Sequence, residues 1–140
     1  MRAFVVTSYK GPLREADVPE PTVGDRDVLV QVRAAGLNQL DEKIREGEFK
    51  QILPYKFPLI LGHDVAGTVV RVGSQVRGFA VGDEVYARPG KDQIGTFAER
   101  VAVAEQDLAL APTSITVEEA GSLPLVALTA WQALVVKGTV

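Results

Sequence analysis

The stretch from Leu59 to Gly73, LILGHDVAGTVVRVG, constrains the fold of this chain more than any other. Two apolar runs flank a Gly62-His63-Asp64 turn, and the second run is rich in β-branched valines, which is typical of a strand. Gly62 suits a residue with positive φ, or a backbone that another group approaches closely. His63, the only histidine, is therefore expected at a strand entrance, where it could simply form hydrogen bonds and end the turn.

Composition and charge narrow the class of protein. The 140 residues suit one ordinary domain, and 46% hydrophobic residues support a packed core. A net charge of −3 without long basic runs argues against nucleic-acid partners. The absence of cysteine excludes disulfides and removes the commonest zinc ligand. With neither a signal peptide nor a long apolar window, we expect a soluble cytoplasmic protein with no membrane partner.

The first two thirds of the chain predict several short strands and one helix. Strands are expected at 3–7, at 28–35, after the Gly-His-Asp turn, at 84–88 and at 96–103, whereas 15–27, 48–58 and 88–95 are expected to be irregular. Asn38 and Gly47 delimit a short helix as N-cap and C′ residue. Asp41 lies at its third position, near the positive end of the helix dipole. Capping alone is a sufficient role for Asn38 and Asp41.

The pattern changes to helix after residue 113. Thr116 and Glu119 form a capping box, with Ile115 placed to pack on Ala120. Helix-forming residues continue through Leu134, but breakers divide them and Gly138 is expected to close the last segment. Strands followed by a terminal helix predict a mainly β protein, a β-barrel or sandwich with helices appended.

Two kinds of site have no sequence support. No two glycines are separated by a single residue, so the chain contains no G-x-G-x-x-G phosphate loop, and it contains no G-x-x-x-x-G-K-[ST]. One histidine and no cysteine exclude a Cys-His nucleophile and argue against a Ser-His-Asp triad.

Taken together, the motifs resemble a known superfamily along the whole chain. They are Asn38-x-x-Asp41-x-Lys43, Pro58-Leu-Ile-Leu-Gly-His-Asp-Val-Ala-Gly67, Gly73-x-x-Val76, Gly82-Asp-Glu-Val85, Gly95-Thr-Phe-Ala-Glu99 and Leu123-Pro-Leu-Val-Ala-Leu-Thr-Ala-Trp-Gln-Ala-Leu134. In this order they resemble the medium-chain dehydrogenase/reductase superfamily. Within it they are most similar to the zinc-independent quinone or enone reductases.

The resemblance implies a fold and a division into domains. Residues 1–113 are expected to form a GroES-like catalytic domain, a β-barrel with short helices. Residues 114–140 are expected to begin a Rossmann domain, with the chain stopping before its glycine motif and inactive alone. The terminal helix would then lack a packing surface for its apolar residues, and a symmetric homodimer through this helix is expected. Those residues are Leu123, Val126, Ala127, Ala130, Trp131, Leu134 and Val135.

Departures from the zinc-dependent branch of the family imply that no zinc is bound. Zinc alcohol dehydrogenases have Cys where Asn38 aligns and Glu where Asp64 aligns, and their structural-zinc lobe is absent between Arg88 and Gly95. A catalytic zinc needs three protein ligands, and this chain offers His63 with at most Asp64. His63 is instead expected to line the cleft between domains.

The implied reaction is hydride transfer from NADPH to a quinone or an α,β-unsaturated carbonyl. The resemblance assigns catalytic positions to Asn38, Asp41, Lys43 and His63, and cofactor contacts to Asn38, Lys43 and Thr129. Lys43 would stabilise enolate charge near the ribose, although a solvated helix face explains it equally well. Thr129 would contact the nicotinamide, although its hydroxyl could bond its own backbone. The alternatives are a zinc-dependent alcohol dehydrogenase and a non-catalytic GroES-like binding module.

Overall fold

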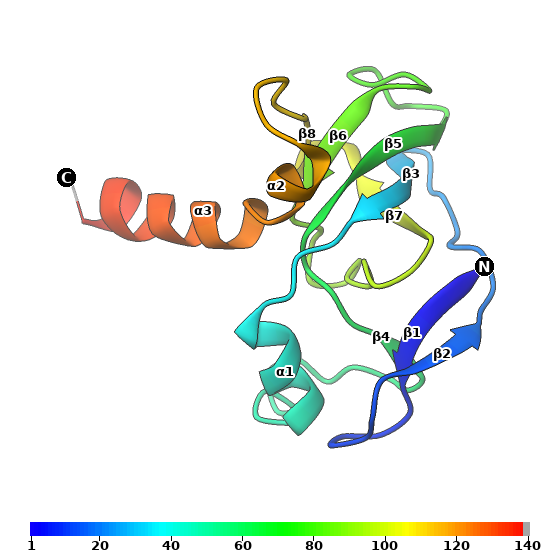
Figure 1. Ribbon diagram of the computed structural model, residues 1–140, viewed down its shortest axis with the longest axis vertical. Helices are drawn as coiled ribbons and strands as arrows, with labels where there is room; N and C mark the ends of the chain where they lie inside the picture. Colours follow the sequence, from blue (N-terminus) through cyan, green and yellow to red (C-terminus); the bar gives the residue numbers. More distant parts are fainter. Residues whose placement is uncertain (139–140) are drawn as a thin grey trace.

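A computed structural model describes residues 1–138, and within them the chain is mainly β, with strands in two antiparallel sheets (Figure 1). The larger sheet has the strand order β7-β3-β5-β6-β8. Two of its neighbouring strands, β3 and β5, come from the valine-rich stretches, and each has three consecutive buried residues. Its members are β3 (Asp27–Ala34), β5 (Val65–Val72), β6 (Glu84–Ala87), β7 (Arg100–Ala104) and β8 (Leu108–Leu110).

The smaller sheet has the order β2-β1-β4 and consists of β1 (Arg2–Val6), β2 (Arg14–Asp17) and β4 (Leu59–Ile60). A bridge between Ala3 and Ala98 joins β1 to the segment before β7. The strand β4 ends one residue before the Gly62-His63-Asp64 turn, and β5 begins immediately after it. The turn therefore connects the two sheets.

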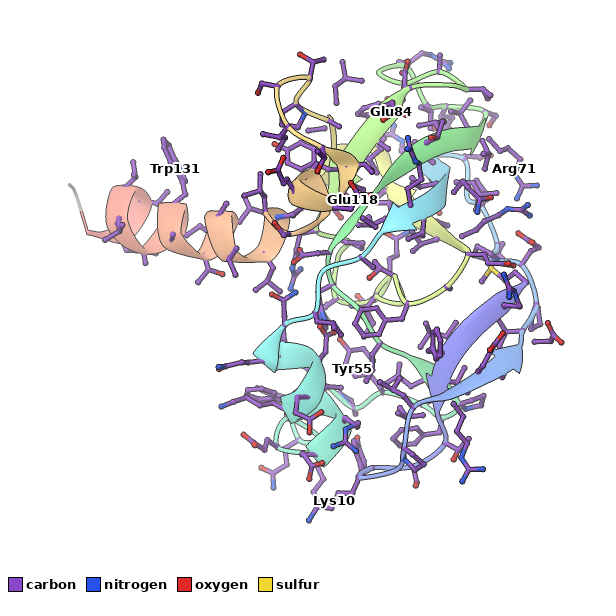
Figure 2. The ribbon with its side chains drawn as sticks, in the orientation of Figure 1. Lys10, Tyr55, Arg71, Glu84, Glu118 and Trp131 are labelled. Atoms are coloured by element: carbon purple, nitrogen blue, oxygen red, sulfur yellow. The ribbon has the colours of Figure 1, made fainter. Side chains whose placement is uncertain are left out.

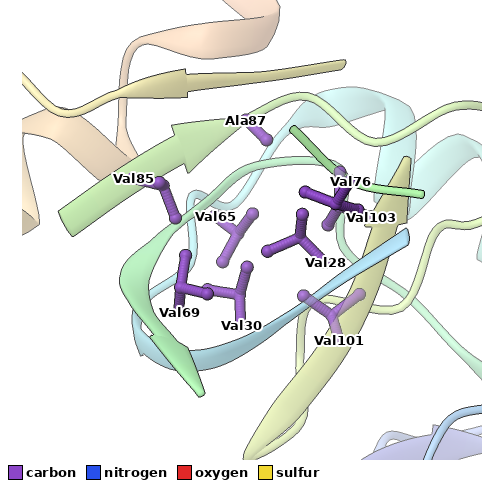
Figure 3. Packing of buried hydrophobic residues seen from close by; sticks show 9 residues of the cluster. All are labelled: Val28, Val30, Val65, Val69, Val76, Val85, Ala87, Val101 and Val103. Carbon is purple, nitrogen blue, oxygen red and sulfur yellow. The ribbon is translucent and has the colours of Figure 1, made fainter. Parts of the chain in front are cut away.

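Valine side chains fill the interior of the larger sheet (Figure 3). A second, smaller core joins Ile44 of the helix α1 to β1 and β4, through Val6, Leu59 and Leu61. This second core fixes α1 beside the turn that carries His63. The valine cluster comprises Val28, Val30, Val65, Val69, Val76, Val85, Ala87, Val101 and Val103.

The helices are α1 (Gln39–Glu46), α2 (Val117–Gly121) and α3 (Pro124–Trp131), together with the 3-10 helix η1 (Glu105–Asp107) and the π-helical segment η2 (Gln132–Lys137). Asn38 is the N-cap of α1, and Gly47 ends it in the left-handed conformation with φ of 81°, as predicted. Figure 1 shows α3 and η2 extending away from both sheets, with only the start of α3 close to them. No helix among residues 1–138 is both long and apolar enough to cross a membrane.

Several local predictions are confirmed. Glu119 donates its backbone N–H to Thr116 Oγ1 and accepts from the Thr116 N–H, so the capping box of α2 is complete. A break at Ser122–Leu123 separates α2 from α3, and Pro124 opens α3, where its missing N–H costs no helical hydrogen bond.

Two predictions of local structure are wrong. The segment 15–27 begins with a true strand, because β2 pairs with β1 through its backbone while its side chains stay exposed and show no apolar pattern. The strand predicted at 96–103 begins only at Arg100, since Thr96–Glu99 crosses from one sheet to the other. Gly138 follows the last helical segment as its C-cap, as predicted, although its φ of −83° is not left-handed.

Candidate active site

Gly62, the first residue of the Gly62-His63-Asp64 turn, occupies a position that only glycine can adopt. Gly62 has φ of 108°, and a Cβ at this residue would lie 2.2 Å from Thr96 Oγ1. Both reasons for a glycine expected from the sequence therefore apply at once. Thr96 is fully buried, and its hydroxyl has no hydrogen-bond partner within residues 1–138.

Asp41 orients the histidine ring. Its Oδ1 lies 2.7 Å from His63 Nδ1 and also accepts from the Gly62 N–H at 2.9 Å. Its Oδ2 accepts from the Asn38 N–H at 3.0 Å. Asp41 and His63 are 4% and 1% exposed. Because a carboxylate only accepts, Nδ1 carries the proton, and Nε2 of the neutral ring is left as an acceptor.

Asp64 joins the start of α1 to the start of α3. Its Oδ2 accepts from Asn38 Nδ2 at 2.8 Å, and its Oδ1 accepts from the Leu125 N–H at 2.7 Å. Asn38 makes no side-chain capping bond to its own helix, because its amide is directed to Asp64 instead. Leu125 lies in the first turn of α3, so the carboxylate satisfies one of the unpaired N–H groups of that helix.

Burial raises the pKa of the Asp64 carboxyl above its ordinary value, and the nearby Asp41 acts in the same direction. The hydrogen bonds from Asn38 and Leu125, with the attraction of His63, oppose this shift but do not cancel it. Asp64 therefore carries its charge at a free-energy cost, which the two hydrogen bonds reduce.

Three of the five predicted site residues are thus brought together, with Asp64 as a fourth member of the group, and two are not. Asn38, Asp41, His63 and Asp64 form one continuous hydrogen-bonded group, although Asp64 was expected only as a possible zinc ligand. Lys43 lies on the exposed side of α1, and its Nζ is 3.5 Å from Glu48 Oε2. Lys43 therefore lies on a solvated helix face, which is one of the two interpretations that the sequence left open.

Thr129 also stands apart from this group. Its hydroxyl donates to the Leu125 carbonyl at 2.7 Å, which is the backbone bond that the sequence left open as an alternative. Its side chain is exposed on α3, one turn after the N–H that Asp64 holds. Sequence reasoning missed the Asp64–Leu125 contact because no local pattern connects two residues so far apart in the chain.

The donors present do not form a zinc site. Among residues 1–138, no group of three or more His, Cys, Asp or Glu side chains is arranged to hold a metal ion. Asp41 and Asp64 flank His63, but each of their oxygens already accepts a hydrogen bond from a protein group. A zinc site that used these two carboxylates would have to break these bonds.

The same fold occurs in known proteins. Residues 24–113 match the alcohol dehydrogenase GroES-like domain. The chain belongs to this family. A crystal structure of an alcohol dehydrogenase superfamily protein from Novosphingobium aromaticivorans superposes on the GroES-like domain and its following helices with a TM-score of 0.93 and 42% identity, over 100% of this chain and 43% of that one. The expected mainly β, GroES-like fold is confirmed.

Two relatives have enzymatic names. Chloroplastic quinone-oxidoreductase QR1 of Triphysaria versicolor is 39% identical over 137 residues, which are 96% of this chain and 42% of the relative. The chloroplastic NADPH-dependent alkenal/one oxidoreductase of Arabidopsis thaliana is 41% identical over 144 residues, 96% of this chain and 37% of the relative. The GroES-like chain is therefore one of the medium-chain dehydrogenase/reductases, related to quinone and alkenal oxidoreductases, and it spans under half of their length.

These names correct the expected location. A cytoplasmic protein was inferred from the lack of a signal peptide and of a long apolar segment. Both relatives are named as chloroplastic, although neither name refers to a membrane or a secretory route. Apolar content reports on membrane insertion and secretion only, so it had no power to distinguish the cytoplasm from an organelle.

Proposed function

We propose that this GroES-like chain is the catalytic-domain part of an NADPH-dependent oxidoreductase that reduces quinones or α,β-unsaturated carbonyls by hydride transfer. The observation that carries the proposal is the buried hydrogen-bonded group of Asn38, Asp41, His63 and Asp64 at the start of α1. The names of the quinone and alkenal oxidoreductases similar to this chain support the same reaction class.

The proposed division of labour follows from how each side chain is held. Bound NADPH supplies the hydride, and the protein orients the reactants and polarises the carbonyl. Asn38 is fixed by two hydrogen bonds, so any contact that it makes with the nicotinamide or the carbonyl starts from one orientation. Asp41 holds His63, whose Nε2 is the ring atom left for the cleft.

Lys43 and Thr129 have accessible positions in this scheme. The Lys43 ammonium is about half exposed and would leave its weak pair with Glu48 to face developing enolate charge or the ribose. Thr129 is exposed on α3 and would meet the nicotinamide side. Its hydroxyl can keep its bond to the Leu125 carbonyl and still accept a hydrogen bond from a ligand.

The proposed domain boundary lies at residue 113. Residues 1–113 would be the catalytic domain and 114–140 the start of the cofactor-binding domain. The match to the alcohol dehydrogenase GroES-like domain ends at 113, and α2 begins shortly after it at Val117. The chain itself has no G-x-G-x-x-G. We therefore expect this polypeptide alone to bind NADPH far more weakly than micromolar, which is about −8 kcal/mol.

The activity is best tested in a chimera, because the chain spans only 37% of the Arabidopsis relative. The matching segment of that protein is replaced by this chain, and NADPH oxidation is followed with a quinone and with an alkenal. Turnover with either supports the proposal, provided that Asn38→Ala and His63→Ala in the chimera reduce it at least tenfold. A folded chimera without turnover overturns it.

The proposed reaction uses no zinc, and elemental analysis of the same chimera tests this. One equivalent of zinc that survives a chelator wash, with alcohol oxidation in place of quinone reduction, would assign the chain to the zinc-dependent dehydrogenases. A chimera that binds neither zinc nor NADPH, although the parent binds NADPH, would favour a non-catalytic binding module.

We also propose that the isolated chain forms a homodimer through α3 and η2. Figure 2 shows Trp131 projecting from this helix, and the residue is 61% exposed. Contiguous exposed apolar surface of this kind usually acquires a partner. A second copy is the simplest one, since a twofold interface pairs the same face with itself. The other exposed apolar residues of the helix are Leu123, Val126, Leu128, Leu134, Val135 and Val136.

A further inference from the structure

We propose that Asp64 is a positioning residue that sets the distance between Asn38 on α1 and Thr129 on α3, and so aligns the two proposed cofactor contacts. This inference rests on the function proposed above. It is carried by one buried carboxylate whose two oxygens each hold a different helix: Oδ2 holds the Asn38 side chain at 2.8 Å and Oδ1 holds the Leu125 N–H at 2.7 Å.

The junction around Asp64 is too closely packed to tolerate another arrangement. A Cβ on Gly36 would lie 2.8 Å from the Gly121 carbonyl oxygen and 2.9 Å from Asp64 Oδ2. A Cβ on Gly121 would lie 3.0 Å from the Ala34 Cβ. The end of α2 therefore rests directly on the segment between β3 and α1, and α3 starts from this contact with its first turn bound to Asp64.

The rest of α3 depends on this attachment for its direction. Beyond Pro124 its residues are half-exposed or exposed, and the helix extends away from the sheets (Figure 1). Thr129 lies one turn beyond Leu125 and bonds its carbonyl, so the position of Thr129 follows that of Leu125. The Asp64 carboxylate therefore fixes Leu125 relative to the His63 turn, and Thr129 is fixed through Leu125.

Both hydrogen bonds specify an acceptor at residue 64, and this allows a reciprocal exchange. In Asp64→Asn the side chain keeps one acceptor oxygen for two donors, so its NH₂ must face either the Leu125 N–H or the NH₂ of Asn38, and the two arrangements compete. Adding Asn38→Asp restores a donor opposite an acceptor, and Asp is also a good N-cap. The double variant D64N/N38D should therefore regain the connection that D64N loses.

The test uses the 140-residue chain without cofactor. Hydrogen exchange of the Leu125 amide, measured by NMR, should be at least tenfold faster in D64N and return to within threefold of wild type in D64N/N38D. Fluorescence anisotropy of Trp131, the only tryptophan, should fall and recover in parallel. Exchange at Leu125 that is unchanged in D64N, or equally fast in the double variant, would overturn the proposal.

A second variant covers the case in which D64N does not fold. Gly36→Ala keeps every polar group but forces the α2–α3 junction away from Asp64, so Leu125 exchange should again accelerate while the Val30 amide in β3 stays protected. The matched control is Gly90→Ala, whose new Cβ would approach only the flexible end of Asp107 at 3.3 Å, and it should leave Leu125 exchange unchanged. If Leu125 exchange accelerated as much in the control as in Gly36→Ala, the positioning role of Asp64 would be contradicted.

The consequence for catalysis is measured separately in the chimera. D64N should raise the KM for NADPH at least fivefold while the KM for the quinone changes less than twofold, since only the alignment of the cofactor contacts is disturbed. Equal effects on both constants would show a merely structural role. The exchange measurements involve no cofactor. They therefore test the positioning role of Asp64 even if the chimera proves inactive and the proposed function fails.

Discussion

Asp41 Oδ1 and His63 Nδ1 lie 2.7 Å apart in the interior of the domain, where both side chains are almost fully buried. The same carboxylate also accepts from the N–H groups of Gly62 and Asn38. One side chain of α1 therefore fixes the backbone of the turn, the tautomer of the histidine and the start of its own helix.

Removing this carboxylate should destabilise the chain strongly. Asp41→Ala leaves three donors without an acceptor, two of them buried and one half-buried, and we expect a loss of about 3 kcal/mol in the free energy of unfolding. Urea denaturation followed by circular dichroism measures it. Asp92→Ala is the control, because Asp92 is 84% exposed and pairs only with Lys91 at 3.6 Å, so its loss should stay below about 0.5 kcal/mol. Equal losses would refute the assigned role of Asp41.

Stability should depend on pH through Asp64 in a direction opposite to that of an ordinary ion pair. Burial raises the folded-state pKa of this carboxyl above its ordinary value of 3.8, so the folded chain binds a proton more readily than the unfolded chain. The cost of the buried charge is fully present above the folded pKa. It is relieved as the pH falls through that pKa toward the unfolded value.

The comparison between wild type and Asp64→Asn isolates this effect. The asparagine variant lacks the titration, so the free energy of unfolding of wild type minus that of the variant should increase as the pH is lowered from about 7 to about 4. Urea midpoints at several pH values provide the difference. A difference that is flat or decreases on acidification would mean that the pKa of Asp64 is not raised.

Alanine substitutions at Gly62 and Gly82 distinguish the cost of backbone strain from the cost of steric overlap. Both have positive φ, 108° and 98°, but a Cβ at Gly82 would meet nothing within 4 Å, whereas one at Gly62 would overlap Thr96 Oγ1. Gly82→Ala should cost about 1 kcal/mol from backbone strain alone. Gly62→Ala should cost at least about 2 kcal/mol more because the neighbouring residues must move. Thermal unfolding of both variants checks the ordering, which similar values would contradict.

The proposed homodimer predicts a specific effect of charge on α3. Trp131→Glu should convert the isolated chain to a monomer in sedimentation velocity at several concentrations, because a carboxylate would be buried in the interface. Leu37→Glu serves as the control: Leu37 is 82% exposed but belongs to the segment before α1 and not to this helix. A wild-type chain that is monomeric at all concentrations, or one that Leu37→Glu dissociates equally, would rule out the α3 interface.

The sequence predicted what depends on local chemistry. The caps Gly47 and Thr116 were identified correctly because each satisfies helix-end groups within a few residues, and Asn38 is the predicted N-cap although its side chain binds Asp64. The valine strands were identified from their β-branched residues, which fill one face of the larger sheet. The resemblance to a family added the order of the motifs, and with it the fold and the reaction class.

What the sequence did not predict depends on partners distant in the chain. The exposed strand β2 has no apolar pattern and exists because β1 offers it a hydrogen-bonding edge. The role of Asp64 depends on Leu125, and the need for Gly62 depends on Thr96, which are contacts that no window of residues contains. Lys43 and Thr129 satisfy the motif, but their closest contacts in the fold are ordinary structural ones.

The position of β3 in the larger sheet affects how the chain folds. Its two neighbours come from much later in the sequence: Val30 is opposite Val69 of β5 on one side, and Val28 is opposite Val103 of β7 on the other. Until the ribosome has released β7, one edge of a valine-rich strand stays without a hydrogen-bonding partner. Such an edge readily pairs with other chains. Folding of this domain should therefore be slow for its size, because its central contacts close such long loops.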